Sequence, residues 1–176
     1  MALDEKWLRE FDEEFGNTRK FLELVPDDKL MWKPHQKSME LGRLAWHLTD
    51  FPEWTVLTFT QDAYEMSPED GDRAMNGWRY KLREDMLARF DGDLPVARAV
   101  LAEASEDALA QIWTMKWNGQ TIIEDPREAV YRKWSLRHMV HHRAQLGVYL
   151  RLLGIAIPGC YGPSADEMVP EVVAAD

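Results

Sequence analysis

The chain of 176 residues has a single cysteine, Cys160, and no long apolar run. One cysteine can form neither an internal disulfide nor a thiolate metal cluster, and no neighbour is expected to lower its pKa, so we expect an inert thiol. No apolar run approaches the roughly 18–20 residues that a membrane-spanning helix needs. The first residues carry acidic side chains at once and do not read as a secretory signal. These absences favour a cytoplasmic location and no membrane partner.

Basic residues are also too few to make the chain cationic. Twenty-one Lys and Arg against 31 Asp and Glu give a formal charge of −10. An acidic surface repels phosphate backbones, so nucleic acid is not an expected partner. There is no internal repeat, while 45% hydrophobic residues and eight tryptophans predict a substantial core. We therefore expect residues 1–176 to form one globular domain, with about 165–176 as a poorly ordered tail.

Apolar residues recur at helical spacing in the first half of the chain. The first predicted helix covers residues 4–24, and the second begins near Ser38, whose hydroxyl can cap a free backbone N–H. Pro52 interrupts the second pattern. Because proline clashes with the carbonyl four residues before it, we expect a kink just past His47. The acidic stretch 66–77 is expected to be a loop.

A third helix is predicted over residues 78–104, as one bent helix or two short ones, because Gly92 and Pro95 lie inside it. Further on, Asn118-Gly119 stands between apolar residues and is a signal for a tight turn, so a short hairpin is possible there.

The last helix has the strongest start signal. Asp125 can cap it, Pro126 suits its first position and Glu128 completes a pattern similar to a capping box. It is predicted to run to about Leu153, where Gly154 can take the left-handed conformation that ends a helix. Four long amphipathic helices predict an all-α fold, a four-helix bundle with a possible short hairpin before the last helix.

Two histidines share one face of the last predicted helix. His138 and His142 are four residues apart and lie on the same side as Trp134 and Tyr149. This apolar and aromatic face is expected to point into the bundle. Buried imidazoles need partners, so the pair either forms hydrogen bonds in a metal-free core, with Gln145, Tyr149 or backbone, or shares a cation.

A third histidine could complete a metal site. His47 lies on the apolar stripe of the second predicted helix, and two ligands rarely suffice for one ion. Three neutral histidines without a fourth protein ligand leave an open position, which is typical of catalytic zinc sites. A water or thiol bound at that position would lose its proton more readily.

Other candidates fit less well. Met139 stands where the glutamate of an H-E-x-x-H metalloprotease would be, so that class is disfavoured. His35 lies in a polar loop and is expected to be solvated. Asp50, one turn after His47, could orient its ring, but its place on a helix favours a solvated side chain, and the general base stays unassigned. Four tryptophans are expected to pack in the core rather than to form a ligand cage: Trp46, Trp54, Trp113 and Trp134.

Three segments together resemble a known family. They are "KPHQKSMELGRLAWHLTDFPEW", "RHMVHHRAQLGVYLRLLG" and the tail "IPGCYGPSADE". They look like the DinB-like superfamily of damage-inducible, metal-binding four-helix proteins, over nearly the whole chain. The resemblance implies a bundle, usually dimeric, with nickel or zinc held by one histidine of the second helix and two of the fourth. Those residues would be His47, His138 and His142.

The rest of the histidine run also matches that family. Ala144 replaces a glycine that is frequent there, and we expect no effect on the site. His141, Arg143 and Gln145 match the remaining positions. They are expected to support the ligands or to pack, and not to bind the metal.

The resemblance implies a reaction class. Some relatives are thiol S-transferases or isomerases that use a low-molecular-weight thiol such as bacillithiol, mycothiol or glutathione, and others are described as metal-dependent hydrolases. We therefore expect an enzyme that activates a small thiol or water for attack on a small electrophile. A hydrolase is the first alternative and a non-catalytic metal-binding stress-response protein is the second. The expected partners are a small-molecule substrate and a second copy of the chain.

Overall fold

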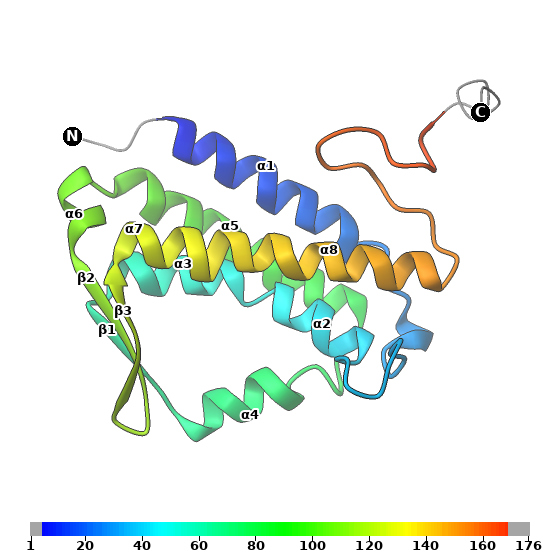
Figure 1. The fold of residues 1–176 in the computed structure, drawn as a ribbon, viewed down its shortest axis with the longest axis horizontal. Coiled ribbons are helices and arrows are strands. Elements are labelled where there is room, and N and C mark those ends of the chain that lie inside the picture. Colours follow the sequence, from blue (N-terminus) through cyan, green and yellow to red (C-terminus); the bar gives the residue numbers. More distant parts are fainter. Residues whose placement is uncertain (1–4, 169–176) are drawn as a thin grey trace.

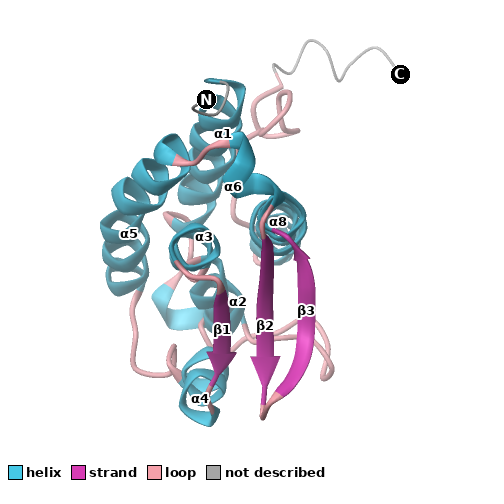
Figure 2. Ribbon diagram, turned by 90° about the vertical axis from the view of Figure 1, so that its left-hand side faces the viewer, coloured by secondary structure: helices cyan, strands magenta, loops and turns pink. Residues whose placement is uncertain are grey.

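The computed structural model describes residues 5–168, which form a helical bundle with a small sheet at one end (Figures 1 and 2). No helix among these residues is long and apolar enough to cross a membrane. The elements in chain order are α1 (Glu5–Leu22), a 3₁₀ turn (Asp27–Lys29), α2 (Leu41–Leu48), α3 (Phe51–Thr60), β1 (Ala63–Met66), α4 (Pro68–Asn76), α5 (Arg83–Glu103), α6 (Glu106–Ala110), β2 (Ile112–Trp117), β3 (Gln120–Pro126), α7 (Arg127–Val130), a π-helical segment (Tyr131–Leu136) and α8 (Arg137–Leu152).

The four predicted helical segments form the bundle. α3 packs on α5, α1 packs on α5 and α8, and α2 packs on α8. Apolar side chains from all of them fill the space between, and the large aromatic ones are fully or almost fully buried. They include Trp7, Phe11, Phe15, Phe51, Phe90 and Tyr131. Burial of aromatic area on this scale is the main stabilising term for such a bundle.

The prediction of an all-α fold is wrong at one end of the molecule. Three strands form a sheet in the order β1-β2-β3 (Figure 2). The predicted hairpin is confirmed, because β2 and β3 are antiparallel and Asn118 and Gly119 both have positive φ, 49° and 73°. No sequence pattern predicted β1. This strand is short and pairs in parallel with β2, a partner far along the chain, so no local pattern reveals it.

The predicted loop 66–77 is also wrong, because it contains α4. Ser67 caps this helix by accepting from the backbone N–H of Asp70, while Asp70 accepts from the backbone N–H of Ser67. Pro68 occupies the first helical position, where its missing N–H costs nothing. In Figure 1, α4 lies on the opposite side of the molecule from α1.

The predicted kink after His47 is confirmed as a complete break between α2 and α3. Pro52 lies in the first turn of α3, where a proline is tolerated. The cap prediction is wrong, since α2 begins at Leu41 with Glu40 and not Ser38 before it. α5 is one helix with Pro95 inside it, and it begins at Arg83 rather than at residue 78.

The last helical segment differs from the prediction at its start. Asp125 belongs to β3, Pro126 is the cap residue of α7, and the π-helical segment joins α7 to α8. Gly154 has a φ of 75°, as predicted. Part of the predicted disordered tail is held in place, because Asp166 accepts hydrogen bonds from Arg151. The remainder of that prediction, 169–176, lies outside the described residues.

Candidate metal centre

Three histidines from α2 and α8 meet inside the bundle. One ring nitrogen of each of His47, His138 and His142 lies within 4.8 Å of the others. The Nε2 atoms of His138 and His142 are 2.9 Å apart. The sequence placed these three side chains together correctly, and their role as metal ligands stays a prediction.

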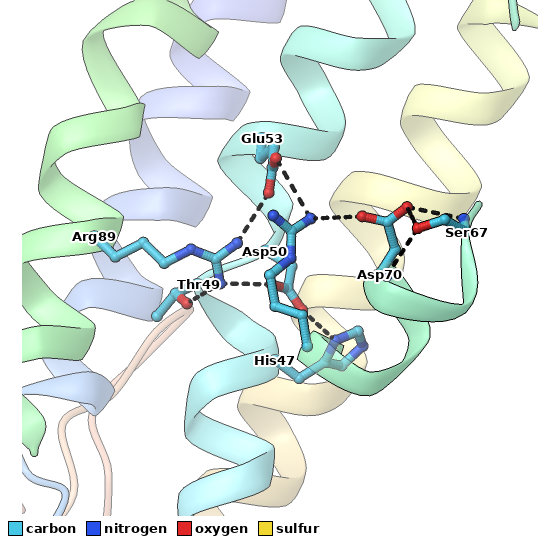
Figure 3. Close-up of polar contacts among 8 residues, drawn as sticks. His47, Thr49, Asp50, Glu53, Ser67, Asp70 and Arg89 are labelled. Atoms are coloured by element: carbon cyan, nitrogen blue, oxygen red, sulfur yellow. Dashed lines mark hydrogen bonds and ion pairs between the residues drawn. The ribbon is translucent and has the colours of Figure 1, made fainter. Parts of the chain in front are cut away.

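Asp50 fixes the orientation of the His47 ring. Nδ1 of His47 donates to Oδ2 of Asp50 at 3.0 Å, and Oδ1 of Asp50 accepts from Arg89 at 2.6 Å (Figure 3). Because Nδ1 carries the proton, Nε2 of His47 keeps the lone pair that a metal needs. Asp50 is only 8% exposed, so the expectation of a solvated side chain is wrong. The i,i+3 spacing to His47 on the same helical face was the available signal.

A second hydrogen bond does the same for His142. Its Nδ1 donates to Oε1 of Gln145 at 2.8 Å, which leaves the lone pair on Nε2. Gln145, which was predicted to support the ligands or to pack, therefore contacts one of the three histidines directly. The bond would also exist in a metal-free core, where Nε2 of His138 would donate to Nε2 of His142, 2.9 Å away. That core would leave Nδ1 of His138, which is buried near the backbone of Trp134, without a donor.

Burial keeps two of the rings neutral. It lowers the pKa of His142 to about 4, assisted by His47 and His138 and opposed by the hydrogen bond to Gln145. Burial and the neighbouring His47 also lower the pKa of His138. Neutral imidazole is the form that binds a metal ion, so at neutral pH protons compete little for these nitrogens.

One aromatic ring shields the cluster from the bundle side. The ring of Phe51 lies with its centroid 5.0 Å from that of His47, 5.2 Å from that of His138 and 6.5 Å from that of His142. Phe51 is fully buried. An apolar wall of this kind lowers the local dielectric constant and excludes water from one side of a metal site.

The π-helical segment determines which side chains share the histidine face. Val130 in α7 packs on the sheet, and His142 faces the bundle. In an unbroken α-helix these two side chains would point about 120° apart. The extra residue that a π-turn accommodates reduces the angle to about 20°, so that both are buried. Ser135 holds the segment, because its hydroxyl lies 2.9 Å from that of Thr55 in α3.

His47 opens onto a small pocket of about 50 Å³. Asp50, Glu53 and Trp54 line it from α3, Tyr64 and Met66 from β1, and Asp70 and Arg73 from α4. Trp54 therefore contributes to a pocket wall as well as to the core, which the sequence did not indicate. Burial, with a hydrogen bond to Asp70, raises the pKa of Tyr64 to about 12, so this phenol stays protonated.

The other predicted residues lie away from the cluster. His35 is exposed, as predicted, and burial raises the pKa of Cys160, which agrees with an inert thiol. His141 is exposed and touches only the ring of His142 among the three histidines, 4.9 Å between centroids. Arg143 turns to the other side of α8 and binds Glu14, which agrees with a packing role.

A mostly helical bundle with three convergent histidines in its interior defines a class of candidate metal-binding proteins. Residues 1–172 match the DinB family, and the chain belongs to that family. This family identity confirms the resemblance drawn from the histidine motifs.

Individual relatives are distant. YrdA of Bacillus subtilis, an uncharacterized protein, is 23% identical over 92% of this chain and 89% of its own length. YfiT of the same organism, described as a probable metal-dependent hydrolase with an unusual four-helix bundle topology, matches with a TM-score of 0.65 and 16% identity over 86% of this chain and 88% of that one. A mycothiol-dependent maleylpyruvate isomerase matches with a TM-score of 0.59 and 13% identity over 88% of this chain and 62% of that one. At such identities the structures show the shared fold alone.

Proposed function

We propose that this protein is a divalent-metal-dependent enzyme in which His47, His138 and His142 hold the metal. The observation that carries the proposal is the state of the three rings. Hydrogen bonds fix the lone pair on Nε2 of His47 and of His142, and Nε2 of His138 lies 2.9 Å from that of His142. Three imidazole nitrogens this close together suit a divalent cation, and nickel and zinc are among the metals that imidazole binds.

The reaction we propose is the attack of a small thiol on a small electrophile. A divalent metal at the three histidines would lower the pKa of a thiol or water bound beside it. Asp50 would hold the His47 ring in the orientation that points Nε2 at the metal, and Phe51 would exclude water from the bundle side. In the product the thiol sulfur is bonded to the electrophilic carbon, and the thiol proton goes to solvent or to the leaving group.

The pocket favours a thiol over a water that needs a general base. Asp50 accepts hydrogen bonds from His47 and Arg89. Glu53 accepts one from Arg89, and Asp70 accepts one from the backbone N–H of Ser67, the cap residue of α4. No carboxylate that lines the pocket is free of such a bond. A thiol loses its proton readily on a metal and needs no base. In a hydrolase, the metal alone would have to deprotonate the less acidic water. The mycothiol-dependent isomerase and the probable hydrolase with this fold supply the two alternatives.

Metal analysis is the first test. Purified protein loaded with zinc and freed of excess should retain about one equivalent, and His138→Ala should retain less than about 0.2. His35→Ala, an exposed histidine in a loop, is the matched control and should retain the wild-type amount. Equal zinc content in His138→Ala and in wild type would exclude the proposed centre.

Activity then separates the alternatives. Zinc-loaded protein is incubated with bacillithiol, mycothiol or glutathione and a set of electrophiles, and separately with a set of esters. Consumption of a thiol that is lost in His47→Ala supports a transferase, and ester cleavage without thiol supports a hydrolase. If neither occurs with fully loaded protein, the result favours a non-catalytic metal-binding role.

A further inference from the structure

Two cavities share a wall beside the histidine cluster. The inner pocket, of about 50 Å³, contains His47. An outer groove of about 390 Å³ lies between α3, α4 and α5, and Val56 and Val96 line it. Glu53 and Arg73 line both cavities, so their side chains form the boundary between them. A ligand that reaches His47 from the groove must pass this pair.

Two arginines meet at Glu53, and they are held very differently. Arg89 is 18% exposed and donates hydrogen bonds of 2.6–2.9 Å to Thr49, Asp50 and Glu53 (Figure 3). It also lies over the ring of Trp46, 4.7 Å from the centroid. These contacts use most of its donors, and Arg89 therefore has a structural role.

Arg73 is loosely held by comparison. It is 51% exposed, and its Nη2 lies 3.4 Å from Asp70 and 3.7 Å from Glu53. Within residues 5–168, its Nε and Nη1 atoms make no hydrogen bond. A guanidinium with free donors in a fork geometry suits a carboxylate, which can accept two parallel hydrogen bonds.

We propose that Arg73 binds the carboxylate of a small substrate whose reacting end lies in the inner pocket beside His47. The inner pocket is too small for an aromatic ring, since a cavity that holds benzene measures about 150 Å³. Only a short chain can therefore separate the carboxylate from the reacting carbon. The rest of a longer substrate would lie in the outer groove, against Val56 and Val96.

The charge of the inner pocket depends on the proposed metal, on which this inference rests. Three carboxylates line this pocket, those of Asp50, Glu53 and Asp70, and Arg73 lines it as well. A divalent cation at the histidines would bring the sum of these charges to zero. The metal would therefore remove the repulsion that the carboxylates exert on an anionic ligand.

The test is a titration of zinc-loaded protein followed by the indole N–H signal of Trp54 in amide NMR spectra, assigned with Trp54→Phe. Propionate should shift this signal and saturate. Propionamide, which has the same shape without the charge, should bind at least about tenfold more weakly. Methyl phosphate is titrated in parallel, and tighter binding of methyl phosphate than of propionate would overturn the choice of a carboxylate.

Variants locate the binding group. Arg73→Gln should weaken propionate binding by about tenfold or more, as the loss of a charge-assisted hydrogen bond implies. Arg79→Gln removes a nearby exposed arginine that lines neither cavity and should bind propionate like wild type. Ala74→Leu, which fills the inner pocket and keeps the guanidinium, should also abolish binding, so the conclusion does not depend on one variant.

The outcomes also separate this inference from the proposed function. Full zinc content with equal propionate affinity in wild type and Arg73→Gln, or with no propionate binding at all, overturns the substrate class and leaves the metal centre in place. Absence of zinc from the wild-type protein overturns the proposed function itself, and the charge argument with it.

Discussion

Helix α8 buries polar groups on two sides. The hydrogen-bonding and charged groups find partners more completely on one side than on the other. On one side, Arg143 is 2% exposed and lies 2.7 Å from a carboxylate oxygen of Glu14. It also donates to the backbone carbonyl of Glu14 and to the hydroxyl of Tyr161. On the other side, His138 and His142 face each other through their Nε2 atoms, and Nδ1 of His138 has no partner.

The difference separates a structural cluster from a binding cluster. The Arg143 cluster contains both signs of charge and joins α8 to α1 and to the tail that carries Tyr161. Its charged groups therefore have their partners within the described part of the chain. In the histidine cluster, three imidazole nitrogens converge within 4.8 Å of one another, which is an arrangement that a cation completes. Each of the following predictions tests one side of this comparison.

The largest effect is expected on the structural side. Arg143→Met should lower the free energy of unfolding by about 3–5 kcal/mol, because it leaves the Glu14 carboxylate without its buried partner. Chemical denaturation of the metal-free protein measures this. Arg98→Met, which removes an exposed partner of Asp12, should cause no measurable change. Zinc content of the folded Arg143→Met protein should stay at the wild-type value, and a loss of zinc would show that the two sides are not independent.

The histidine side should respond in the opposite way. His138→Leu should change the stability of the metal-free protein by less than about 1 kcal/mol, because it replaces a half-satisfied ring with an apolar side chain. Zinc at a free concentration 100 times its Kd should stabilise wild type by about 2.7 kcal/mol and the variant not at all. Thermal unfolding with and without zinc measures both. A large loss of stability without metal would mean that the cluster is a structural core.

A smaller effect is expected from the residue that orients His47. Asp50→Asn keeps an acceptor for Nδ1 and removes the charge, so the Kd for zinc should rise by about 10–100-fold. Competition with a chromogenic chelator gives this value. Asp72→Asn, an acidic residue of α4 that lines neither cavity, is the control and should leave the Kd unchanged.

The smallest effect is a dependence of stability on pH. The pKa of His142 is lowered in the folded protein, so the unfolded chain takes up the proton first as pH falls. Metal-free wild type should therefore lose stability between about pH 6.5 and about pH 4. His142→Asn should lose less over the same range in denaturant titrations. Equal losses in both proteins would show that the ring is already solvated.

Much of the histidine cluster could be predicted from sequence because helical periodicity is local. The spacing of His138 and His142 fixes their common face in any helix, and the apolar stripe around His47 directs that ring inward. Asp50 was misjudged because its burial depends on Arg89 in α5, which lies far along the chain. The same limit applies to β1, which among residues 5–168 pairs with β2, a strand that follows three further helices.

The sequence by itself determined the four long helical segments, the Asn118-Gly119 turn and the inward direction of the three histidines, because each depends on contacts within a few residues. Only the tertiary structure decided which groups surround the three histidines. It placed α4 and β1 over the pocket beside His47, tied Asp50 to Arg89, and left Arg73 half exposed at the boundary of two cavities. These are contacts between distant segments, and their energies depend on burial and geometry that no local pattern encodes.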